Sequence, residues 1–474
     1  MNRKRSNAVT IFLPIILVLV DYIAIISAEQ GAYLLRNFFV PTGGRLHISW
    51  LNFWVVFPAL FLLFINVEQP YNRRTQFWQV VKNLFTASIY GILAVILVLY
   101  FGHIAGSTSR LFITLFGVLS FIFLVIFRFI TKKLFNHFGF LQIPVIIIGA
   151  GKTAEVLVKG IIGDAGMGYI IVGLLEDNYV EEGILQQFPL LGGFADAESV
   201  IQETGVQHIF IAAPGLEQEK LRKLIYRLQP LVKNLAVVPN LVGVPMGGIE
   251  VENLFNEKLM LLRIKNNLAR PLNRYMKAIF DYTLTFFGMI AISPILLFIA
   301  IWIYKDSPGP VIFKHIRIGK EGKPFPCYKF RSMCVDAKER LAELLENDSE
   351  ARAEWNKDFK LKNDPRITKS GAFLRKTSLD ELPQIFNVLK GEMSLVGPRP
   401  IIHEELERYS EYVGDYLMVK PGITGMWQVN GRSDTTYEER VLLDSWYVRN
   451  WSVWIDVMLL WRTVKTVFCG KGAY

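Results

Sequence analysis

The chain has 474 residues, enough for about three domains. Hydrophobic residues make up 52% of it and charged residues only 20%, below the roughly 25% usual in soluble domains. The 52 basic and 42 acidic residues leave a formal charge of +10. These values exclude a disordered chain and a wholly soluble enzyme. Three cysteines are too few for a disulfide scaffold, and the six histidines show no zinc-ligand spacing. A basic, apolar chain indicates a membrane protein that handles anions.

Four apolar stretches before residue 131 have the roughly 20 residues that a bilayer-spanning helix needs. They are Ala8–Ala28, Ile48–Val67, Leu84–Gly102 and Leu111–Ile130. We therefore predict a four-helix transmembrane domain over residues 1–135. Basic residues concentrate at both ends of this unit and between its second and third helices, so the positive-inside rule predicts that both ends face the cytoplasm. Asp21 lies within the first stretch, where we expect it to pair with another helix, the alternative being a functional role.

Residues 140–260 alternate between strand and helix patterns, which predicts a Rossmann-like parallel α/β domain. The expected strands are Val145–Ile148, Ile170–Leu175, His208–Ala213 and Ala236–Pro239. The glycine turn at Gly149 and Gly151 resembles part of a dinucleotide fingerprint. Because any tight strand–helix turn favours glycine, a structural or oligomerisation module without a ligand is the preferred interpretation.

A fifth apolar run, Tyr282–Tyr304, carries Ser293 and Pro294 at its middle. Proline kinks or breaks a helix, and a neighbouring serine can satisfy the carbonyl group that the proline leaves free. Basic residues flank both ends of the run, which opposes a crossing. We predict a re-entrant membrane helical hairpin over residues 278–304, with an ordinary kinked span as the alternative.

The chain after residue 306 is dense in short motifs that place arginine beside glycine and proline. They are Arg317-Ile318-Gly319, Lys329-Phe330-Arg331-Ser332-Met333, Asn363-Asp364-Pro365-Arg366, Gly397-Pro398-Arg399-Pro400, Lys420-Pro421-Gly422-Ile423-Thr424-Gly425 and Gln428-Val429-Asn430-Gly431-Arg432. Arginine suits bidentate recognition of phosphate, so the group predicts a loop-rich anion site.

Asp380 and Glu381 are adjacent carboxylates in Ser378-Leu379-Asp380-Glu381-Leu382-Pro383-Gln384. Ser378 and Glu381 have capping-box spacing, which predicts that a helix begins here. The helix dipole would then favour the ionised carboxylates, as a nucleophile or a metal ligand requires. Two capping residues without chemistry are the alternative.

The ordered motifs resemble the bacterial sugar transferase family, the polyprenyl-phosphate hexose-1-phosphate transferases, in its long form. The resemblance implies a phosphoglycosyl transferase domain over residues 271–474. It also implies transfer of a hexose-1-phosphate, with galactose favoured over glucose, from a UDP-hexose to undecaprenyl phosphate and release of UMP. Asp380 would be the nucleophile and a ligand of Mg²⁺, with Glu381 beside it. The implied phosphate and nucleotide contacts are Lys329, Arg331, Arg399 and Arg432, followed by Arg317, Arg366 and Arg375.

The resemblance further implies a multi-pass protein of the bacterial inner membrane whose catalytic domain faces the cytoplasm. Its expected partners are membrane lipid and a second copy of the chain in a homodimer, with no nucleic acid. Three alternatives stay open from the residues alone. They are a five-span transporter, a nucleotide-sugar oxidoreductase that uses the glycine turn, and a non-catalytic membrane assembly protein.

Overall fold

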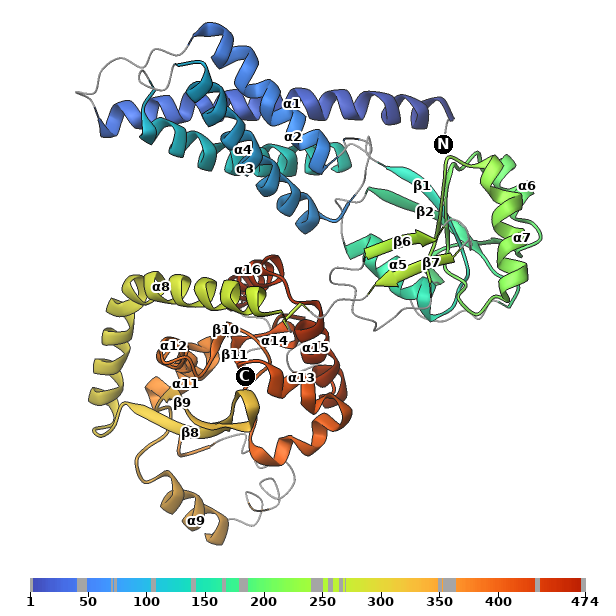
Figure 1. Cartoon of the computed structure of the whole chain (residues 1–474). Helices are drawn as coiled ribbons and strands as arrows, with labels where there is room; N and C mark the ends of the chain where they lie inside the picture. The colour runs from blue at the N-terminus through green and yellow to red at the C-terminus, as the bar shows by residue number, and fades with distance from the viewer. Residues whose placement is uncertain are drawn as a thin grey trace. The chain divides into compact units, whose positions relative to one another are not determined.

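The computed structural model describes residues 3–40, 49–69, 71, 75–103, 108–137, 142–163, 168–178, 186–239, 250–254, 259–263, 267–268, 270–347, 352, 364–430 and 435–469. The chain divides into two compact units, Met1–Val242 and Gly243–Tyr474. The first unit holds the amino-terminal helices and a parallel sheet, and the second holds the arginine-rich motifs (Figure 1).

The amino-terminal helices are α1 (Arg3–Phe39), α2 (Phe57–Glu68), α3 (Phe77–Phe101) and α4 (Arg110–His137). A π-helical turn, Asn52–Val56, leads into α2. Among the described residues, α1, α3, α4 and the later helix α8 are long and apolar enough to cross a membrane. The second predicted span is shorter than expected, because its helical segment Asn52–Glu68 has only 17 residues. At 1.5 Å per residue that segment falls short of the roughly 30 Å hydrocarbon core.

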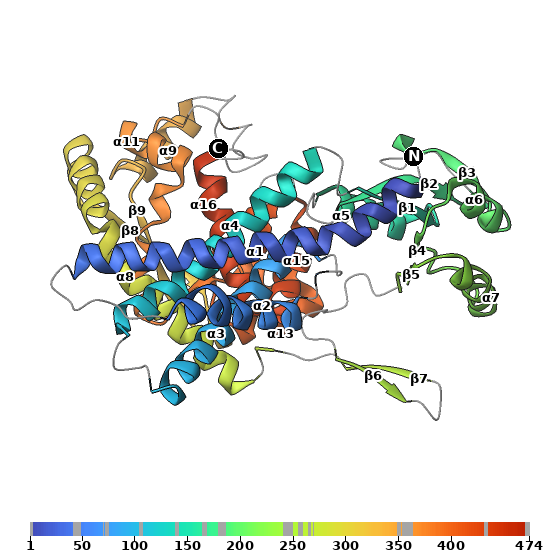
Figure 2. The same cartoon turned by 90° about the horizontal axis from the view of Figure 1, so that it is seen from above.

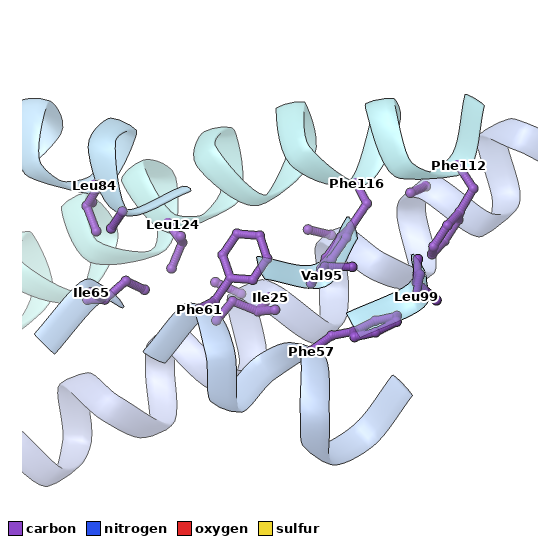
Figure 3. Close-up of a cluster of buried hydrophobic side chains, with 14 of the residues drawn as sticks. Ile25, Phe57, Phe61, Ile65, Leu84, Val95, Leu99, Phe112, Phe116 and Leu124 are labelled. Atoms are coloured by element: carbon purple, nitrogen blue, oxygen red, sulfur yellow. The ribbon is translucent and has the colours of Figure 1, made fainter. Parts of the chain in front are cut away.

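The four helices nevertheless share one apolar core. Ile25, Phe61, Leu84 and Leu124 come from α1, α2, α3 and α4, and all are almost completely buried (Figure 3). Asp21 is buried beside this core, where it accepts hydrogen bonds from Arg128 Nε at 2.9 Å and from the Tyr71 hydroxyl at 2.8 Å. The prediction that Asp21 pairs with another helix is therefore confirmed.

The parallel sheet of the first unit has the strand order β3-β2-β1-β4-β5. Its elements are β1 (Ile143–Ile148), α5 (Lys152–Gly163), β2 (Tyr169–Leu175), β3 (Leu190–Gly192), α6 (Ala197–Thr204), β4 (His208–Ile211), α7 (Gln218–Leu228) and β5 (Asn234–Val237). The predicted strands and the parallel α/β class are confirmed, and β3 and α6 are additions. β1 is central and almost wholly buried, which explains its unbroken β-branched sequence.

The second unit begins with an antiparallel pair, β6 (Glu250–Leu254) and β7 (Leu259–Arg263), which form a sheet of their own (Figure 2). Helix α8 (Pro271–Asp306) follows. The remaining elements are β8 (Ile312–Ile318), β9 (Pro324–Phe330), α9 (Ala337–Asn347), α11 (Lys369–Thr377), α12 (Gln384–Leu389), β10 (Ser394–Val396), α13 (Val413–Met418), β11 (Gly422–Thr424), α14 (Met426–Asn430), α15 (Tyr437–Asn450) and α16 (Val453–Cys469).

Helix α8 changes direction sharply between its two halves (Figure 1). Pro294 lies inside the helix and has no N–H for the carbonyl of Ile290. The Ser293 hydroxyl donates to that carbonyl at 2.9 Å, as expected for a serine beside a proline in an apolar helix.

Both ends of α8 are held by the same compact unit. Near its start, Lys277 Nζ lies 2.8 Å from Asp456 Oδ2 of α16, and Ser394 of β10 donates to Asp281 at 2.7 Å. At its end, Asp306 accepts from the Ser370 backbone N–H at 2.8 Å. Both ends of the helix are therefore anchored within the second unit.

Candidate active site

The β8–β9 ribbon gathers basic side chains on one face. The antiparallel register places His315 opposite Cys327 and Phe313 opposite Lys329, with Arg317 two residues farther along β8. Residues that alternate along paired strands share a face, so these side chains project together. Burial, together with nearby Arg317 and Lys329, lowers the pKa of His315. This face is therefore positive before any substrate binds.

The adjacent carboxylates lie against this face. Lys329 Nζ is 2.7 Å from Glu381 Oε1, and both side chains are partly buried. Burial raises the pKa of Asp380, a rise that Lys329 opposes and the Glu381 charge increases. Glu381 thus forms an ion pair with Lys329, and the charges of both side chains act on Asp380.

The local structure around this pair differs from the predicted one. Leu379–Glu381 is a single 3-10 turn, and Ser378 makes no side-chain capping bond to it. Ser378 instead has φ of 58°, in the left-handed region, and ends α11. The predicted capping box is wrong because the glutamate side chain reaches Lys329, away from the helix backbone. One short turn has little dipole, so burial dominates the Asp380 pKa and raises it.

Arg375 completes the group around Asp380. It projects from the last turn of α11, and its charge lowers the pKa of Asp380 against the effect of burial. Its Nε donates to the Ser332 hydroxyl at 2.9 Å, which ties α11 to the segment after β9. The fold therefore brings together Lys329, Arg375 and Asp380, which lie up to 51 residues apart in the sequence.

A second basic pair, Arg317 and Arg399, lies near the first group. Burial and the Arg399 charge lower the pKa of Arg317, whose Nη1 is 3.6 Å from Glu405 Oε2. The Cys327 thiol lies between the two groups and interacts electrostatically with Lys329, Glu381 and both arginines. Burial raises the pKa of this thiol to about 11, so Cys327 stays protonated and serves as packing, not as a nucleophile.

The two glycine motifs after residue 396 form one structure. β10 and β11 pair in parallel, and the Gly422 N–H donates to the Pro398 carbonyl at 2.7 Å. The Gly397 N–H donates to the Thr424 carbonyl at 2.9 Å. A Cβ on Gly422 would lie 2.1 Å from the Gly397 nitrogen, so only glycine allows this approach. The contact presents the exposed Arg399, whose guanidinium lies 5.5 Å from the Trp427 ring centroid.

Two predicted phosphate contacts have other partners. Arg331 is buried, and its guanidinium donates to the Ser307 carbonyl at the end of α8. Arg366 binds Asp364 of its own motif, with Nη2 to Oδ2 at 2.6 Å. Direct contact of these two arginines with phosphate stays a prediction. Arg432 lies outside the described residues.

Sequence reasoning missed several residues that shape the site. Asn387 is fully buried and clamps β9, because it accepts from the Tyr328 N–H at 3.0 Å and donates to the Pro326 carbonyl at 2.7 Å. Trp427 lies between Arg399 and Arg440, the latter 4.7 Å from its ring centroid. The signal for Trp427 was its position two residues after Gly425 of the glycine motif.

The carboxylates fit a magnesium ion that is held partly by a substrate. The described residues contain no group of three or more His, Cys, Asp or Glu able to hold a metal alone. Mg²⁺ commonly takes one or two protein carboxylates and completes its shell with phosphates and water. Asp380 is the available ligand, since Glu381 is engaged by Lys329.

Comparison with known proteins decides the family. Residues 272–470 match the family described as bacterial sugar transferase. The undecaprenyl-phosphate galactose phosphotransferase of Salmonella typhimurium is 42% identical over 411 residues, which cover 85% of this chain and 84% of that protein. The chain belongs to the bacterial sugar transferase family. Its active-site candidates, from Arg317 to Arg399, all fall inside the matched sugar transferase range.

Other relatives of this sugar transferase act on named sugars. The UDP-galactose-lipid carrier transferase of Erwinia amylovora is 38% identical over 85% of this chain and 84% of its own length. The UDP-glucose:undecaprenyl-phosphate glucose-1-phosphate transferase of Escherichia coli is 32% identical over 72% of this chain and 70% of its own length. The two galactose relatives are thus more similar to this sugar transferase than the glucose relative.

Residues 48–239 also match a second family, which is described as CoA-binding domain.

Proposed function

We propose that this enzyme transfers galactose-1-phosphate from UDP-galactose to undecaprenyl phosphate and releases UMP. The observation that carries the proposal is the 42% identity over 85% of the chain to a galactose phosphotransferase. The site chemistry agrees with it, because Asp380 is placed among Lys329, Arg375 and Glu381. The same reaction with UDP-glucose is the second candidate, favoured only by the more distant glucose relative.

Asp380 acts as the nucleophile in two steps. A carboxylate oxygen attacks the phosphorus that carries the sugar, and the bond to the UMP oxygen breaks. The product is an acyl phosphate, a mixed anhydride between the Asp380 carboxylate and the sugar phosphate, and UMP leaves with the electron pair. An undecaprenyl phosphate oxygen then attacks the same phosphorus, which forms the lipid diphosphosugar and regenerates the carboxylate. No net proton transfer is required between ionised phosphates.

The surrounding residues position and neutralise charge. Lys329 and Arg375 face Asp380 and offset the negative charge of the incoming diphosphate. Arg399 and Arg317 supply further positive charge on the same side of β9. Mg²⁺ bound by Asp380 and the substrate would supply additional charge neutralisation when present. Phosphoryl transfer depends mainly on such positioning and electrostatics, so this set of groups suffices.

The decisive experiment measures UMP release by the full chain with undecaprenyl phosphate and Mg²⁺. UDP-galactose, UDP-glucose and UDP-N-acetylglucosamine are compared for the wild type, Asp380→Asn and Asp336→Asn. Asp336 is an exposed carboxylate paired with Arg340, so its variant is the matched control. We expect turnover with UDP-galactose in the wild type and the control, and a loss of at least about a thousandfold in Asp380→Asn.

Other outcomes have distinct meanings. Turnover with a different sugar would replace galactose within the same reaction. Undiminished turnover in Asp380→Asn would eliminate the covalent mechanism. The absence of turnover with every sugar, from folded protein, would favour a non-catalytic membrane assembly protein.

Helix α8 is proposed to enter and leave the membrane on the cytoplasmic side as a re-entrant hairpin. A straight helix of 36 residues would be about 54 Å long, and its ends would emerge on opposite sides of a bilayer. The bend at Pro294 and the attachment of both ends to one unit support a re-entrant path. This path keeps the catalytic groups at the membrane surface, where a soluble sugar nucleotide and a lipid phosphate can meet.

The orientation is tested by labelling introduced cysteines in intact cells. Lys323→Cys reports the segment after α8, and Lys159→Cys on α5 serves as the cytoplasmic reference, since both lysines are exposed. We expect a membrane-impermeant maleimide to modify neither residue until the cells are opened. Modification of Lys323→Cys in closed cells would show that α8 crosses the membrane. The homodimer is a separate proposal, tested by mass measurement of the purified protein in nanodiscs.

A further inference from the structure

Trp427 is an aromatic side chain of the second unit that two arginines contact. The Arg399 guanidinium lies 5.5 Å from the ring centroid, and the Arg440 guanidinium lies 4.7 Å from it. Both separations are within the range of a cation–π attraction, in which a cation meets the negative face of an aromatic ring. The ring is buried, with 7% of its surface exposed. A ring in these surroundings offers no open face on which a uracil base could stack.

The loop that carries Arg399 has a restrained backbone. Arg399 is exposed between two buried prolines, Pro398 and Pro400, and each proline fixes its own φ angle. A Cβ on Gly425 would lie 2.4 Å from the Gly397 carbonyl oxygen, so the segment that begins α14 is in direct contact with this loop. The direction of the long Arg399 side chain is then decided by the groups that contact its guanidinium.

Trp427 orients the Arg399 side chain without using its hydrogen-bond donors. A guanidinium has five N–H donors, and a carboxylate partner consumes some of them, as Asp364 does when it accepts from Nε and Nη2 of Arg366. A ring face attracts the guanidinium through its charge, so the N–H groups at the guanidinium edge stay available to an anion. Arg440, one turn into α15, holds the ring in turn. Arg399 is thus oriented and still able to donate.

The two basic groups of the candidate site suit the two phosphates of a sugar nucleotide. The charges of Lys329 and Arg375 act on Asp380, which attacks the phosphorus that carries the sugar in the proposed function. Arg317 and Arg399 form the second group, in which the charge of Arg399 acts on Arg317. A single bridging oxygen joins the two phosphates of a diphosphate. The phosphate of the departing UMP therefore lies beside the first group and falls to the second.

We propose that Trp427 is a positioning residue that directs Arg399 onto the phosphate of the departing UMP. As the bond to the UMP oxygen breaks, that oxygen takes the electron pair, and Arg399 meets the negative charge that develops there. Arg440 holds the ring and does not touch the nucleotide. The inference rests on the proposed function, because it takes UMP as the leaving group.

The test uses UMP as the probe and measures its dissociation constant on the full-length protein in nanodiscs, which requires no turnover. The variants are Trp427→Leu, Arg399→Ala and the two combined. A further protein carries trifluorotryptophan at position 427, which keeps the shape of the ring but weakens its negative face. Tyr412→Leu is the matched control, because the Tyr412 ring lies 5.7 Å from the Arg449 guanidinium and neither residue belongs to the candidate site. The unfolding temperature of each protein is recorded in parallel.

We expect Trp427→Leu to bind UMP roughly threefold to thirtyfold more weakly, the range of one cation–π contact. The trifluorotryptophan protein should show a smaller loss at an unchanged unfolding temperature, and Tyr412→Leu should show none. The combined variant should bind UMP no more weakly than Arg399→Ala alone, because Trp427 acts through Arg399. The KM for undecaprenyl phosphate should stay within about twofold of the wild-type value, since the second step no longer involves UMP.

Three results would overturn the proposal. Wild-type UMP affinity in Trp427→Leu would show that the ring does not position Arg399. Losses that add in the combined variant would show that Trp427 acts by another route. Wild-type UMP affinity in the trifluorotryptophan protein would show that the ring contributes shape alone. A wild-type protein that binds UMP as expected but transfers no galactose-1-phosphate would count against the proposed function alone.

Discussion

At the scale of single residues, charge and burial oppose each other around Asp380. A nucleophilic carboxylate has to be ionised, yet burial raises the pKa of Asp380. Lys329 and Arg375 act in the opposite direction and keep the ionised form accessible. The sequence predicted these residues as members of one site, and the structure brings Lys329, Arg375 and Asp380 together. It did not show that Glu381 would pair with Lys329, because that contact joins residues 52 positions apart.

Asp380→Asn should stabilise the folded protein while it abolishes turnover. A carboxyl group whose pKa is raised by folding contributes stability at low pH, and that contribution is lost as the pH rises through the folded-state pKa. A neutral asparagine removes the cost of a buried charge near neutral pH. Thermal unfolding of the wild type and the variant across pH 4 to pH 8, roughly the range over which a raised carboxyl titrates, measures the difference. A variant that is less stable at neutral pH would contradict the prediction.

Asp444 should make stability depend on pH near neutrality. It is almost fully buried on α15, accepts from the Tyr409 hydroxyl at 2.9 Å, and lies beside the Arg399 backbone. Burial raises its pKa to about 7, so its contribution to stability is present in acid and is lost as the pH rises through about 7. Asp444→Asn should flatten the fall in unfolding temperature between pH 6 and pH 8, about one unit either side of that pKa. An unchanged slope would show that Asp444 does not titrate there.

At the scale of elements, short pieces of backbone position the arginines. β10 and β11 each have three residues, yet their pairing holds the loop that carries Arg399. β9 is held by the buried amide of Asn387, and its ribbon with β8 presents Lys329 and Arg317. The glycines and prolines of the motifs thus serve the geometry of the backbone. Some of the arginines beside them lie in the candidate site, whereas Arg331 donates to the Ser307 carbonyl at the end of α8.

Gly422→Ala should disrupt the loop that presents Arg399. The added Cβ would lie 2.1 Å from the Gly397 nitrogen, so the strands have to separate. We expect a loss of stability of about 1–3 kcal/mol, as for overpacking in a core, together with reduced UMP release. Chemical denaturation and the turnover assay measure the two effects.

Gly414→Ala on α13 is the matched control, because a Cβ there meets no atom within 4 Å. It should leave activity unchanged and alter stability by no more than about 1 kcal/mol, in the stabilising direction. Equal damage from both substitutions would refute the role assigned to the Gly397–Gly422 contact.

At the scale of the whole molecule, the chain consists of two compact units that contain different elements. The first contains α1 to α4 and the parallel sheet, and the second contains every described residue of the candidate active site. The glycine turn of the sheet gives no support to an oxidoreductase. The Glu176 carboxylate accepts from the Ala150 N–H at 2.8 Å, so an amide that would face a dinucleotide phosphate already has an anionic partner.

Deletion of residues 1–265 should preserve the chemistry but weaken the protein. The buried network that anchors the start of α8, including Lys277, Asp281 and Asp456, lies entirely within the remaining part. We expect measurable UMP release from the truncated protein, with a lower unfolding temperature or altered assembly. Gel filtration and thermal unfolding in nanodiscs accompany the turnover assay. A well-folded truncation with no turnover would show that the first unit takes part in catalysis.

The sequence by itself determined the membrane helices, the parallel α/β class and the family. The length of an apolar run, the alternation of strand and helix patterns and the order of motifs are local properties of the sequence. Each can therefore be recognised without knowledge of the tertiary structure. The second helix shows the limit of this reasoning, since composition marked Ile48–Val67 as a span but only Asn52–Glu68 forms the helical segment. Burial against α1, α3 and α4 accounts for its apolar residues equally well.

Only the tertiary structure decided which motif residues meet. Ser378 and Glu381 have the spacing of a capping box, but spacing cannot reveal that a distant lysine competes for the glutamate. Arg331 and Arg375 were both predicted to contact phosphate, yet Arg331 donates to the carbonyl at the end of α8 and Arg375 faces Asp380. The physical reason is that side-chain direction and charge partners depend on contacts between segments far apart in the chain, and the free energy of those contacts is set when the segments pack.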